Sequence, residues 1–454
     1  MSYTRFAIAF AMSFPGIFAG VSHAETIAIR IGHQTMCTDT YPAGIVIKER
    51  HLLEKYLPHT GKYKNVKYDI VWRDYDSGAP ITNMMLANKL DFGVMGDYPL
   101  VVNGSKFQQT KDERSILITM TAYNLDGAGN SIVVPASSSV TSVRQLVGKN
   151  ISVPIGSSAW GMLYEMAKQE GLKFSDFDVS NQTPMVGITA IAAKKIDAHA
   201  DFCPMAEYME YKGTGRMIYS GADTNVPYLH GVVVRKSFAE KYPEIVVAYD
   251  KAVIDADHWI ASNPYVASKL MSSWTMIPKE VLYLYFSRGG YLTADPTIKP
   301  KWLETLNYDH TLLAKYAGIP PLNLQQWVDP SYLEKAYTEM GLDYKKQVAQ
   351  LHNPKIDINM PAEIWVAGEG IKKYQTNVDM FNALNGLIKA NKAINATYVY
   401  DLNSGLKMFG VDAWYVKDGA SIKAFMTKGS AEKNQKASGG QVLTFSQLEK
   451  SASI

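Results

Sequence analysis

The first half of the chain alternates strand-like and helix-like segments. Residues 26–34 (TIAIRIGHQ) alternate apolar and polar positions as a strand does, and residues 45–57 (IVIKERHLLEKYL) place apolar side chains at helical spacing. The same alternation continues to about residue 201. Strands and helices that alternate at this pitch predict an α/β fold with a mainly parallel sheet. In such sheets ligands bind in the loops beyond the carboxyl ends of the strands.

The pattern changes after residue 237. Residues 238–340 are mostly helical in pattern, residues 341–359 are polar and are expected to be a linker, and residues 360–449 combine short strands with a helix. This last part is expected to be an α+β module. No internal repeat and no low-complexity tract is apparent.

The first 24 residues have the pattern of a secretory signal peptide. Arg5 precedes an apolar stretch, and Ser22-His23-Ala24 supplies small residues at a cleavage site. An N-terminal membrane anchor is the alternative, but the stretch is short and Pro15-Gly16 interrupts it. The mature protein is therefore expected in an oxidising compartment, the periplasm.

Composition narrows the possible functions. The chain has 46 Lys and Arg against 43 Asp and Glu, and this small excess argues against a nucleic-acid binder. Two cysteines, Cys37 and Cys203, are too few for a disulfide scaffold or a four-thiolate zinc site. The sequence has no serine-hydrolase, zinc-protease, P-loop or dinucleotide-binding motif. A binding protein is therefore favoured over an enzyme, and no catalytic residue, resident metal or cofactor is expected.

Candidate ligand-binding residues gather in loops that follow predicted strands. Each has a structural alternative, because aspartates and serines cap helices and a cysteine can be a core residue. Their joint occurrence at strand ends nevertheless predicts a ligand cleft. The candidates are Cys37, Thr38, Asp39, Asp97, Tyr98, Ser157, Ser158, Trp160, Asp201, Phe202, Tyr228 and His230.

Several ordered segments resemble the substrate-binding proteins of nitrate/sulfonate/taurine-type ABC importers. They are IRIGHQ, MLANKLDFGVMGDYP, SVRQLVGKNISVPIGSSAWGM and IAAKKIDAHADFCP. The resemblance covers residues 26–340 and implies a type II periplasmic binding protein, with two α/β lobes around the ligand. It also implies an inner-membrane ABC permease as partner. The implied parts are lobe 1 at 25–124 and 233–340, lobe 2 at 125–232, and hinge crossings near 122–131 and 226–233.

The candidate loops differ from those expected of an anion receptor. Asp39, Asp97 and Asp201 stand in three of them, without any Arg or Lys. Because buried carboxylates beside an anion are costly, a small nitrogen-containing organic solute is expected, either cationic or rich in hydrogen-bond donors. A sulfonate- or nitrate-type anion receptor and an enzyme on the same two-lobed fold are the alternatives.

The two cysteines leave three further alternatives open. Cys37 and Cys203 could form a disulfide, remain free thiols, or bind a soft metal, which would make the protein a copper-binding and delivery protein. Other soft or borderline ligand atoms in the same two loops belong to His33, Met36, His199 and Met205.

The C-terminal part resembles a second family. The segments PAEIWVAGEG, ATYVYDLNSG and AWYVKDG resemble NosL, an accessory copper-binding family. That family binds copper through a Cys-x-x-Cys-Gly-Met-like segment, whereas the matching stretch here retains only His352 and Met360. A docking or structural role is therefore expected for residues 360–449.

Overall fold

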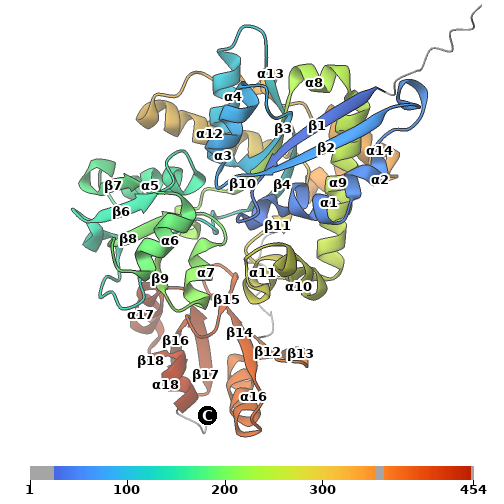
Figure 1. Ribbon diagram of the computed structural model, residues 1–454. Coiled ribbons are helices and arrows are strands. Elements are labelled where there is room, and N and C mark those ends of the chain that lie inside the picture. The colour runs from blue at the N-terminus through green and yellow to red at the C-terminus, as the bar shows by residue number, and fades with distance from the viewer. Residues whose placement is uncertain (1–24, 353–361, 451–454) are drawn as a thin grey trace, which may run out of the picture.

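The computed structural model describes residues 25–352 and 362–450 (Figure 1). These residues form two α/β lobes and a C-terminal α+β unit, which confirms the expected fold class. The predicted signal peptide, Met360 and part of the expected linker lie outside the described residues. Within the described ranges, no helix combines the length and apolarity that crossing a bilayer requires.

The first lobe is built on a six-stranded sheet in the order β11-β4-β10-β3-β1-β2. Strand β1 is parallel to β2 and β3, whereas β10 is antiparallel to β3 and β4. Helices cover both faces of this sheet, so its central strands are buried over nearly their whole length. Its strands are β1 (Thr26–His33), β2 (Lys67–Asp74), β3 (Phe92–Gly96), β4 (Ser115–Asn124), β10 (Tyr228–Arg235) and β11 (Thr293–Ala294).

The helices of the first lobe come from both ends of its sequence. Helix α9 shows why they form, since Pro243 stands at its first turn and its apolar residues pack on the sheet and on α2 and α14. The helices are α1 (Ile45–Glu49), α2 (Leu52–Tyr56), α3 (Gly78–Leu86), α4 (Asp97–Gln108), α8 (Lys236–Lys241), α9 (Pro243–Ser262), α10 (Pro264–Trp274), α11 (Lys279–Phe286), α12 (Pro300–Ala317), α13 (Leu324–Trp327), α14 (Ser331–Glu339) and α15 (Tyr344–Ala349), with the 3₁₀ helices η1 (Thr38–Ala43) and η2 (Gly61–Tyr63).

Helix α15 lies inside the expected linker and corrects that expectation. Lys299 Nζ donates to the carbonyl oxygen of Gln347 at 2.9 Å and pairs with Asp295 Oδ2 at 2.9 Å. The backbone N–H of His352 donates to the Tyr123 hydroxyl at 2.9 Å. Residues 341–352 are therefore packed on the first lobe, and their polar side chains cover its surface.

The second lobe has a five-stranded sheet in the order β7-β6-β8-β5-β9. Its elements are β5 (Ser131–Pro135), η3 (Val143–Leu146), β6 (Asn150–Val153), α5 (Ser158–Gln169), η4 (Phe174–Asp176), β7 (Asp178–Asn181), α6 (Pro184–Ala192), β8 (Ala198–Asp201), α7 (Met205–Tyr211), β9 (Gly215–Ser220) and η5 (Gly221–Thr224).

The chain crosses between the two sheets at residues 125–130 and 221–227. The first crossing lies within the expected range. The second lies earlier than expected, because β10 pairs with β4 and β3 over its full length. Tyr228 and His230 therefore belong to the first lobe, whereas the expected boundary at residue 232 had assigned them to the second.

The C-terminal unit contains two small antiparallel sheets, in the orders β13-β12-β14-β15 and β17-β16-β18. Its elements are β12 (Ala362–Val366), β13 (Gly370–Tyr374), α16 (Asn377–Lys389), β14 (Ile394–Tyr400), β15 (Lys407–Phe409), β16 (Trp414–Asp418), β17 (Ser421–Phe425), α17 (Lys428–Ser438), β18 (Gln441–Thr444) and α18 (Phe445–Lys450).

The two halves of this unit repeat one another, contrary to the sequence expectation. Each half is a hairpin followed by a helix and a returning strand. Thr376 and Thr427 cap the two helices through their side chains. The two threonines are as far apart in sequence as Gly368 and Gly419, the glycines of the two hairpin turns. Few other positions are shared, so the repeat is visible in the structure and was missed in the sequence.

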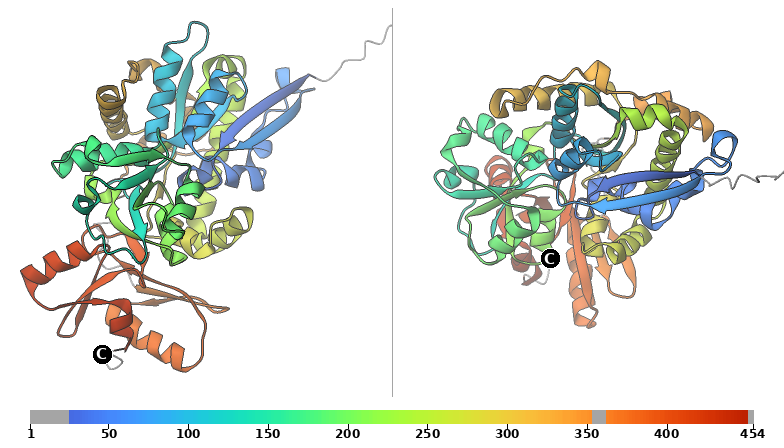
Figure 2. Two further views of the ribbon diagram at one scale, coloured as in Figure 1. Left: turned by 60° about the vertical axis from the view of Figure 1, so that its left-hand side comes forward. Right: turned by 45° about the horizontal axis from the view of Figure 1, so that its top comes forward.

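The C-terminal unit contacts both lobes (Figures 1 and 2). On the first lobe, Tyr398 donates its hydroxyl to the Glu280 carbonyl oxygen at 3.0 Å. On the second lobe, the rings of Phe409 and Tyr211 lie 5.7 Å apart. The half with β12, β13 and β14 lies against α10 and α11, and the half with β16, β17 and α17 lies beside the second lobe.

Candidate functional site

The candidate site lies between the two lobes. Loops that follow β1, β2 and β3 approach it from the first lobe, together with the start of β10, and loops that follow β6 and β8 approach it from the second. They enclose a cavity of about 10 Å³, which is the room of a single water molecule. Its lining consists of Gln34, Cys37, Gly78, Gly96, Pro99, Ser157, Ser158, Phe202, Tyr228 and His230.

Two glycines allow the lobes to approach this closely. A Cβ atom on Gly96 of the first lobe would lie 2.7 Å from Ser158 Oγ of the second. A Cβ atom on Gly161 would lie 2.1 Å from the ring of Tyr98. Any side chain at these positions would therefore hold the lobes apart.

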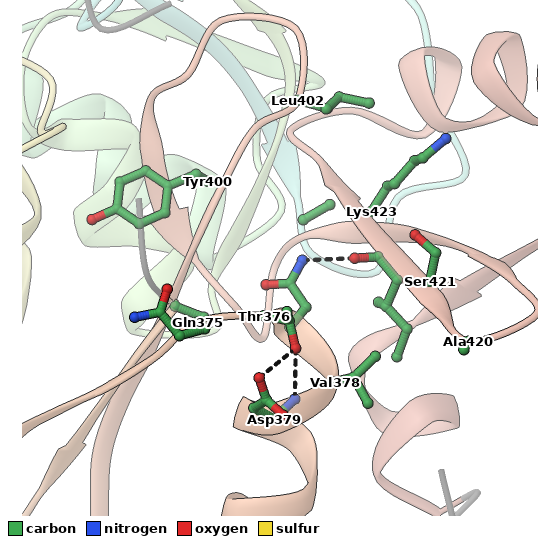
Figure 3. A pocket seen from close by; sticks show the side chains of 13 residues that line it. Gln375, Thr376, Val378, Asp379, Tyr400, Leu402, Ala420, Ser421 and Lys423 are labelled. Atoms are coloured by element: carbon green, nitrogen blue, oxygen red, sulfur yellow. Dashed lines mark hydrogen bonds between the residues drawn. The ribbon is translucent and has the colours of Figure 1, made fainter. Parts of the chain in front are cut away.

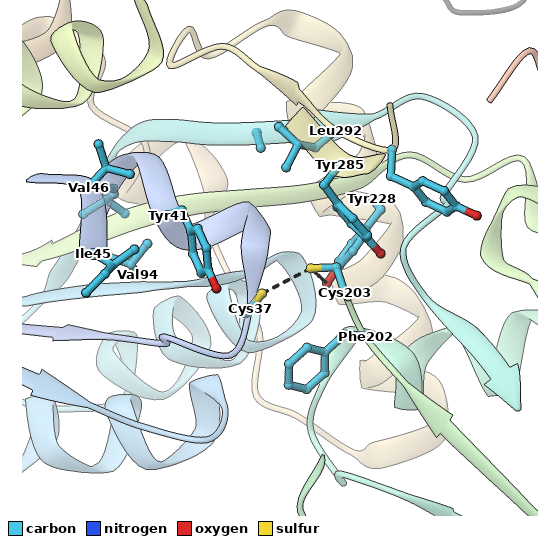
Figure 4. Close-up of a cluster of buried hydrophobic side chains, with 14 of the residues drawn as sticks. Cys37, Tyr41, Ile45, Val46, Val94, Phe202, Cys203, Tyr228, Tyr285 and Leu292 are labelled. Atoms are coloured by element: carbon cyan, nitrogen blue, oxygen red, sulfur yellow. Dashed lines mark hydrogen bonds between the residues drawn. The ribbon is translucent and has the colours of Figure 1, made fainter. Parts of the chain in front are cut away.

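Two thiols and an imidazole meet at the centre of the site. Cys37 Sγ of the first lobe lies 3.2 Å from Cys203 Sγ of the second, and both cysteines are free (Figure 4). His230 Nε2 lies 3.4 Å from Cys37 Sγ. The Tyr228 hydroxyl lies 3.1 Å from His230 Nε2 and 3.6 Å from Cys203 Sγ. Of the three alternatives for this pair, the structure shows two free thiols that are neighbours.

Burial favours the neutral forms of His230 and Cys203. Burial lowers the pKa of His230 to about 3, so its imidazole is neutral at physiological pH. Burial also raises the pKa of Cys203 well above its ordinary value, and the hydrogen bond with Cys37 raises it further. Asp39 Oδ2 lies 3.5 Å from His230 Nδ1, and burial raises the pKa of Asp39 to about 7. The Thr38 hydroxyl donates to Asp39 Oδ1 at 3.0 Å.

Asp97 forms a second polar centre at the lobe boundary. Its Oδ1 accepts from the Ser158 hydroxyl at 2.5 Å, and its Oδ2 accepts from the Leu229 N–H at 2.9 Å. Burial raises the pKa of Asp97 to about 6, although these hydrogen bonds oppose the shift. Ser157 Oγ accepts from the Trp160 N–H at 3.3 Å and caps α5.

The structure brings half of the predicted residues to the cavity wall: Cys37, Ser157, Ser158, Phe202, Tyr228 and His230. Asp39 and Asp97 stand directly behind this wall through their contacts with His230 and Ser158. Thr38 supports Asp39, and Tyr98 fills the space beside Gly161.

Asp201 and Trp160 were expected at the cavity, but they do not line it. Asp201 Oδ2 lies 2.8 Å from His199 Nε2, and its Oδ1 accepts from the Phe202 N–H at 2.9 Å. Both side chains of the Asp201–His199 pair are buried inside the second lobe. Trp160 packs edge-on against Tyr164. The other expected soft ligands also lie elsewhere, since the ring of His33 packs on Trp72 and Met205 lies in the core.

Four lining residues were not among the predicted candidates: Gln34, Gly78, Gly96 and Pro99. Three of them stand in or beside the loops that carried candidates, but they lack the ionisable or aromatic groups by which the candidates were recognised. Gly78 starts α3 after Ser77, and this small-polar turn before a helix was the signal that could have revealed it.

The cavity wall carries no cationic side chain. Among the described residues, no Lys and no Arg lines it, whereas two carboxyl groups stand behind it. The site therefore offers thiols, hydroxyls, an imidazole and two acids to a ligand. Such a set suits a cation or a hydrogen-bond donor better than an anion.

A wider pocket of about 530 Å³ lies in the C-terminal unit, between its two halves (Figure 3). Helix α16 begins there, where Asn377 Nδ2 donates to the Ile422 carbonyl oxygen at 3.0 Å. At the start of this helix, the Thr376 hydroxyl donates to Asp379 Oδ2 and accepts from the Asp379 N–H. Asn377 thus joins the two halves of the unit at this pocket.

Comparisons with known proteins find similarity to periplasmic binding proteins. Residues 70–267 match the model of a family described as NMT1/THI5 like. A taurine-binding periplasmic protein of Escherichia coli strain K12 is 31% identical over 198 residues, which make up 43% of this chain and 58% of that relative. The match therefore spans less than two thirds of the length of that relative.

Two solved structures share the fold of residues in both lobes. The alkanesulfonate-binding protein SsuA from Xanthomonas axonopodis pv. citri, bound to MOPS, has a TM-score of 0.57 at 19% identity over 68% of this chain and 99% of its own. The aliphatic sulphonate-binding protein SsuA from Escherichia coli has a TM-score of 0.54 at 20% identity, with the same coverage. These findings confirm the resemblance of residues 26–340 to sulfonate- and taurine-type binding proteins.

Proposed function

We propose that this protein is the periplasmic solute-binding component of an ABC importer. The single observation that carries the proposal is the cavity between the lobes, whose wall is shared by loops of both sheets. A solute held there would contact both lobes and would stabilise their closed arrangement. The closed form would then dock on an inner-membrane permease. The periplasmic relatives support this location.

We propose further that the solute is cationic or rich in hydrogen-bond donors. The taurine-binding relative and the MOPS-bound structure are named for sulfonates. In this chain, no Lys or Arg of the described residues lines the cavity, and the carboxyl groups of Asp39 and Asp97 stand behind its wall. An anion buried there would lack a counter-charge, and this cost favours the opposite sign of charge.

A binding role is also favoured over an enzymatic one. The relatives are named as binding proteins. The cavity has room for about one water molecule, so an organic solute requires the lobes to separate before it can enter. This requirement agrees with a receptor that opens and closes around its cargo.

Thermal-shift and calorimetric titrations with alkylamines, guanidines, taurine and MOPS test the proposal. A solute at 100 times its Kd stabilises the protein by about 2.7 kcal/mol, which is easily measured. We expect amines or guanidines to bind and sulfonates to fail, with Asp97→Asn weakening binding. Micromolar binding of taurine would refute the proposed charge selectivity, and turnover of a bound solute would refute the receptor role.

A further inference from the structure

We propose that Cys37, Cys203 and His230 form a binding site for a soft monovalent metal ion of the Cu(I) class. The inference rests on the proposed function, since it names the kind of cation that the closed cleft can hold. Each residue offers one ligand atom, and these three atoms lie within 4.8 Å of one another. All three side chains are buried. Thiolate sulfur and imidazole nitrogen are ligand types that select soft ions.

The imidazole is oriented as a metal ligand requires. Asp39 Oδ2 lies 3.5 Å from His230 Nδ1, and this carboxyl favours a proton on Nδ1. The lone pair of Nε2 then points toward Cys37 Sγ, 3.4 Å away. A carboxyl group behind a ligating histidine is a common arrangement in metal sites, because it fixes the ring and its tautomer.

Tyr228 can release the imidazole nitrogen without losing its own hydrogen bond. With the His230 proton on Nδ1, the Tyr228 hydroxyl is the donor to His230 Nε2, 3.1 Å away. Cys203 Sγ lies 3.6 Å from the same hydroxyl, so rotation of the O–H bond redirects the proton to the sulfur. A thiolate at that position is a stronger acceptor than the thiol present now.

The space between the ligand atoms fits an ion and excludes an organic molecule. With metal–sulfur bonds of about 2.3 Å, a three-coordinate ion needs its two sulfurs roughly 4 Å apart. They are 3.2 Å apart, so the two loops must separate by less than about 1 Å. Because one cysteine belongs to each lobe, the ion would join the lobes directly.

The number of ligands favours Cu(I) over zinc. Structural zinc sites take four protein ligands, whereas among the described residues no fourth His, Cys, Asp or Glu completes this group. Binding is a substitution without redox change: each thiol releases one proton to solvent, and two metal–sulfur bonds and one metal–nitrogen bond form. The complex carries one negative charge, which a hydrogen bond from Tyr228 would partly offset.

The proposal is tested with reduced full-length mature protein under anaerobic conditions. Cu(I) is titrated in competition with the chromophoric chelator bathocuproine disulfonate, and Zn(II) is titrated separately. We expect one Cu(I) per chain and weaker retention of zinc. Cys37→Ser and Cys203→Ser should each weaken Cu(I) binding at least 100-fold, and His230→Gln should weaken it at least 10-fold.

His59→Gln, which alters an exposed imidazole away from the site, serves as the control and should not change the affinity. Unchanged Cu(I) binding in the Cys37→Ser/Cys203→Ser double variant would overturn the site. If the variants do not fold, X-ray absorption of the copper-loaded wild type decides: two sulfurs and one nitrogen support the site, and oxygen and nitrogen alone refute it.

The outcomes also separate this inference from the proposed function. If Cu(I) does not bind but an amine or guanidine raises Tm, the metal site is wrong and the receptor role stands. If neither binds and taurine does, both the metal site and the proposed charge selectivity are wrong.

Discussion

Ser158 of the second lobe donates its hydroxyl to Asp97 Oδ1 of the first lobe at 2.5 Å. The contact joins the first residue of α5 to the first residue of α4, so each helix start is fixed against the opposite lobe. It joins the two lobes directly, side chain to side chain. Because both side chains are buried, this hydrogen bond should stabilise the closed arrangement of the two lobes.

Replacing Ser158 by Ala should loosen the closed arrangement. Removal of the hydroxyl takes one donor from Asp97 Oδ1 and leaves the Tyr98 N–H in place, and the loss should be about 1–2 kcal/mol. We expect a lower Tm and a larger radius of gyration in small-angle scattering of the solute-free protein. Ser157→Ala is the matched control, because Ser157 caps α5 within one lobe: it should lower Tm and leave the radius unchanged.

Lys407 should be essential for docking of the C-terminal unit. Its Nζ pairs with Glu363 Oε2 at 2.8 Å and donates to Ser287 Oγ of the first lobe at 2.6 Å, and all three side chains are buried. Lys407→Met leaves the buried Glu363 carboxylate with the more distant ammonium of the exposed Lys373, 3.7 Å away, and this change should cost at most about 3–5 kcal/mol. Urea denaturation and hydrogen exchange of β12–β15 would measure the loss.

The double variant Lys407→Met/Glu363→Gln provides the control for this prediction. It removes the carboxylate charge together with the Lys407 cation, so much of the stability should return. Equal losses in the single and double variants would show that loss of the ion pair itself, and not the buried charge left on Glu363, accounts for the effect.

Glu207 should make stability fall as the pH rises. Burial raises its pKa to about 7 from an unfolded value near 4.5, although the Tyr285 hydroxyl donates to Glu207 Oε2 at 2.7 Å and opposes the shift. A raised carboxyl pKa contributes stability that is fully present below about pH 4.5 and is lost as the pH rises through about 7. Other groups titrate in the same range, so the prediction concerns the difference between variants.

The Glu207→Gln variant lacks this titration. Relative to wild type, it should gain stability between pH 5 and 7 by up to about 1.4 kcal/mol per pH unit. Urea denaturation at pH 5, 6, 7 and 8 would measure this slope. A difference that stays constant across these pH values would contradict the assignment of a raised pKa to Glu207.

Mild oxidation should join the two lobes covalently. Cys37 and Cys203 lie 166 positions apart in sequence, so a disulfide between them would close a long loop and could stabilise the protein by up to about 5 kcal/mol in the chain-entropy model. A two-electron oxidant such as diamide would remove one proton and one electron from each thiol, and the two sulfurs would form a disulfide bond. We expect loss of both thiols in an Ellman titration, a higher Tm, and loss of Cu(I) binding.

Reduction with dithiothreitol is the control for this experiment and should restore both thiols. Intermolecular disulfides instead of the internal one would contradict the prediction, because both sulfurs are buried and only 3.2 Å apart within one chain.

The sequence revealed much of the site through local signals. The carboxyl ends of parallel strands meet at one edge of each sheet, and the resemblance to two-lobed binding proteins implied that the loops of Cys37, Ser158 and Phe202 face one another. It could not assign the lobe of Tyr228 and His230, because the antiparallel pairing of β10 with β4 joins segments more than 100 positions apart.

Local sequence patterns also did not show which hydrogen-bond partner each buried polar side chain takes. Asp201 and His199 lie two positions apart on one strand and therefore on one face, and their mutual contact withdraws Asp201 from the cleft. The sequence shows the spacing of these residues, but which partner captures a buried carboxylate depends on the packing around it. Whether Cys37 and Cys203 are neighbours likewise depends on how closely the two lobes approach one another.

The contacts of the C-terminal unit with both lobes have a kinetic consequence. Separation of the lobes must break or slide its contacts with one of them, either at Tyr398 or at Phe409. This requirement lowers the fraction of molecules that are open and able to admit a solute, and the apparent affinity falls by the same fraction. The rate at which the proposed solute binds would then be limited by spontaneous separation of the lobes, and its dissociation would be slow for the same reason.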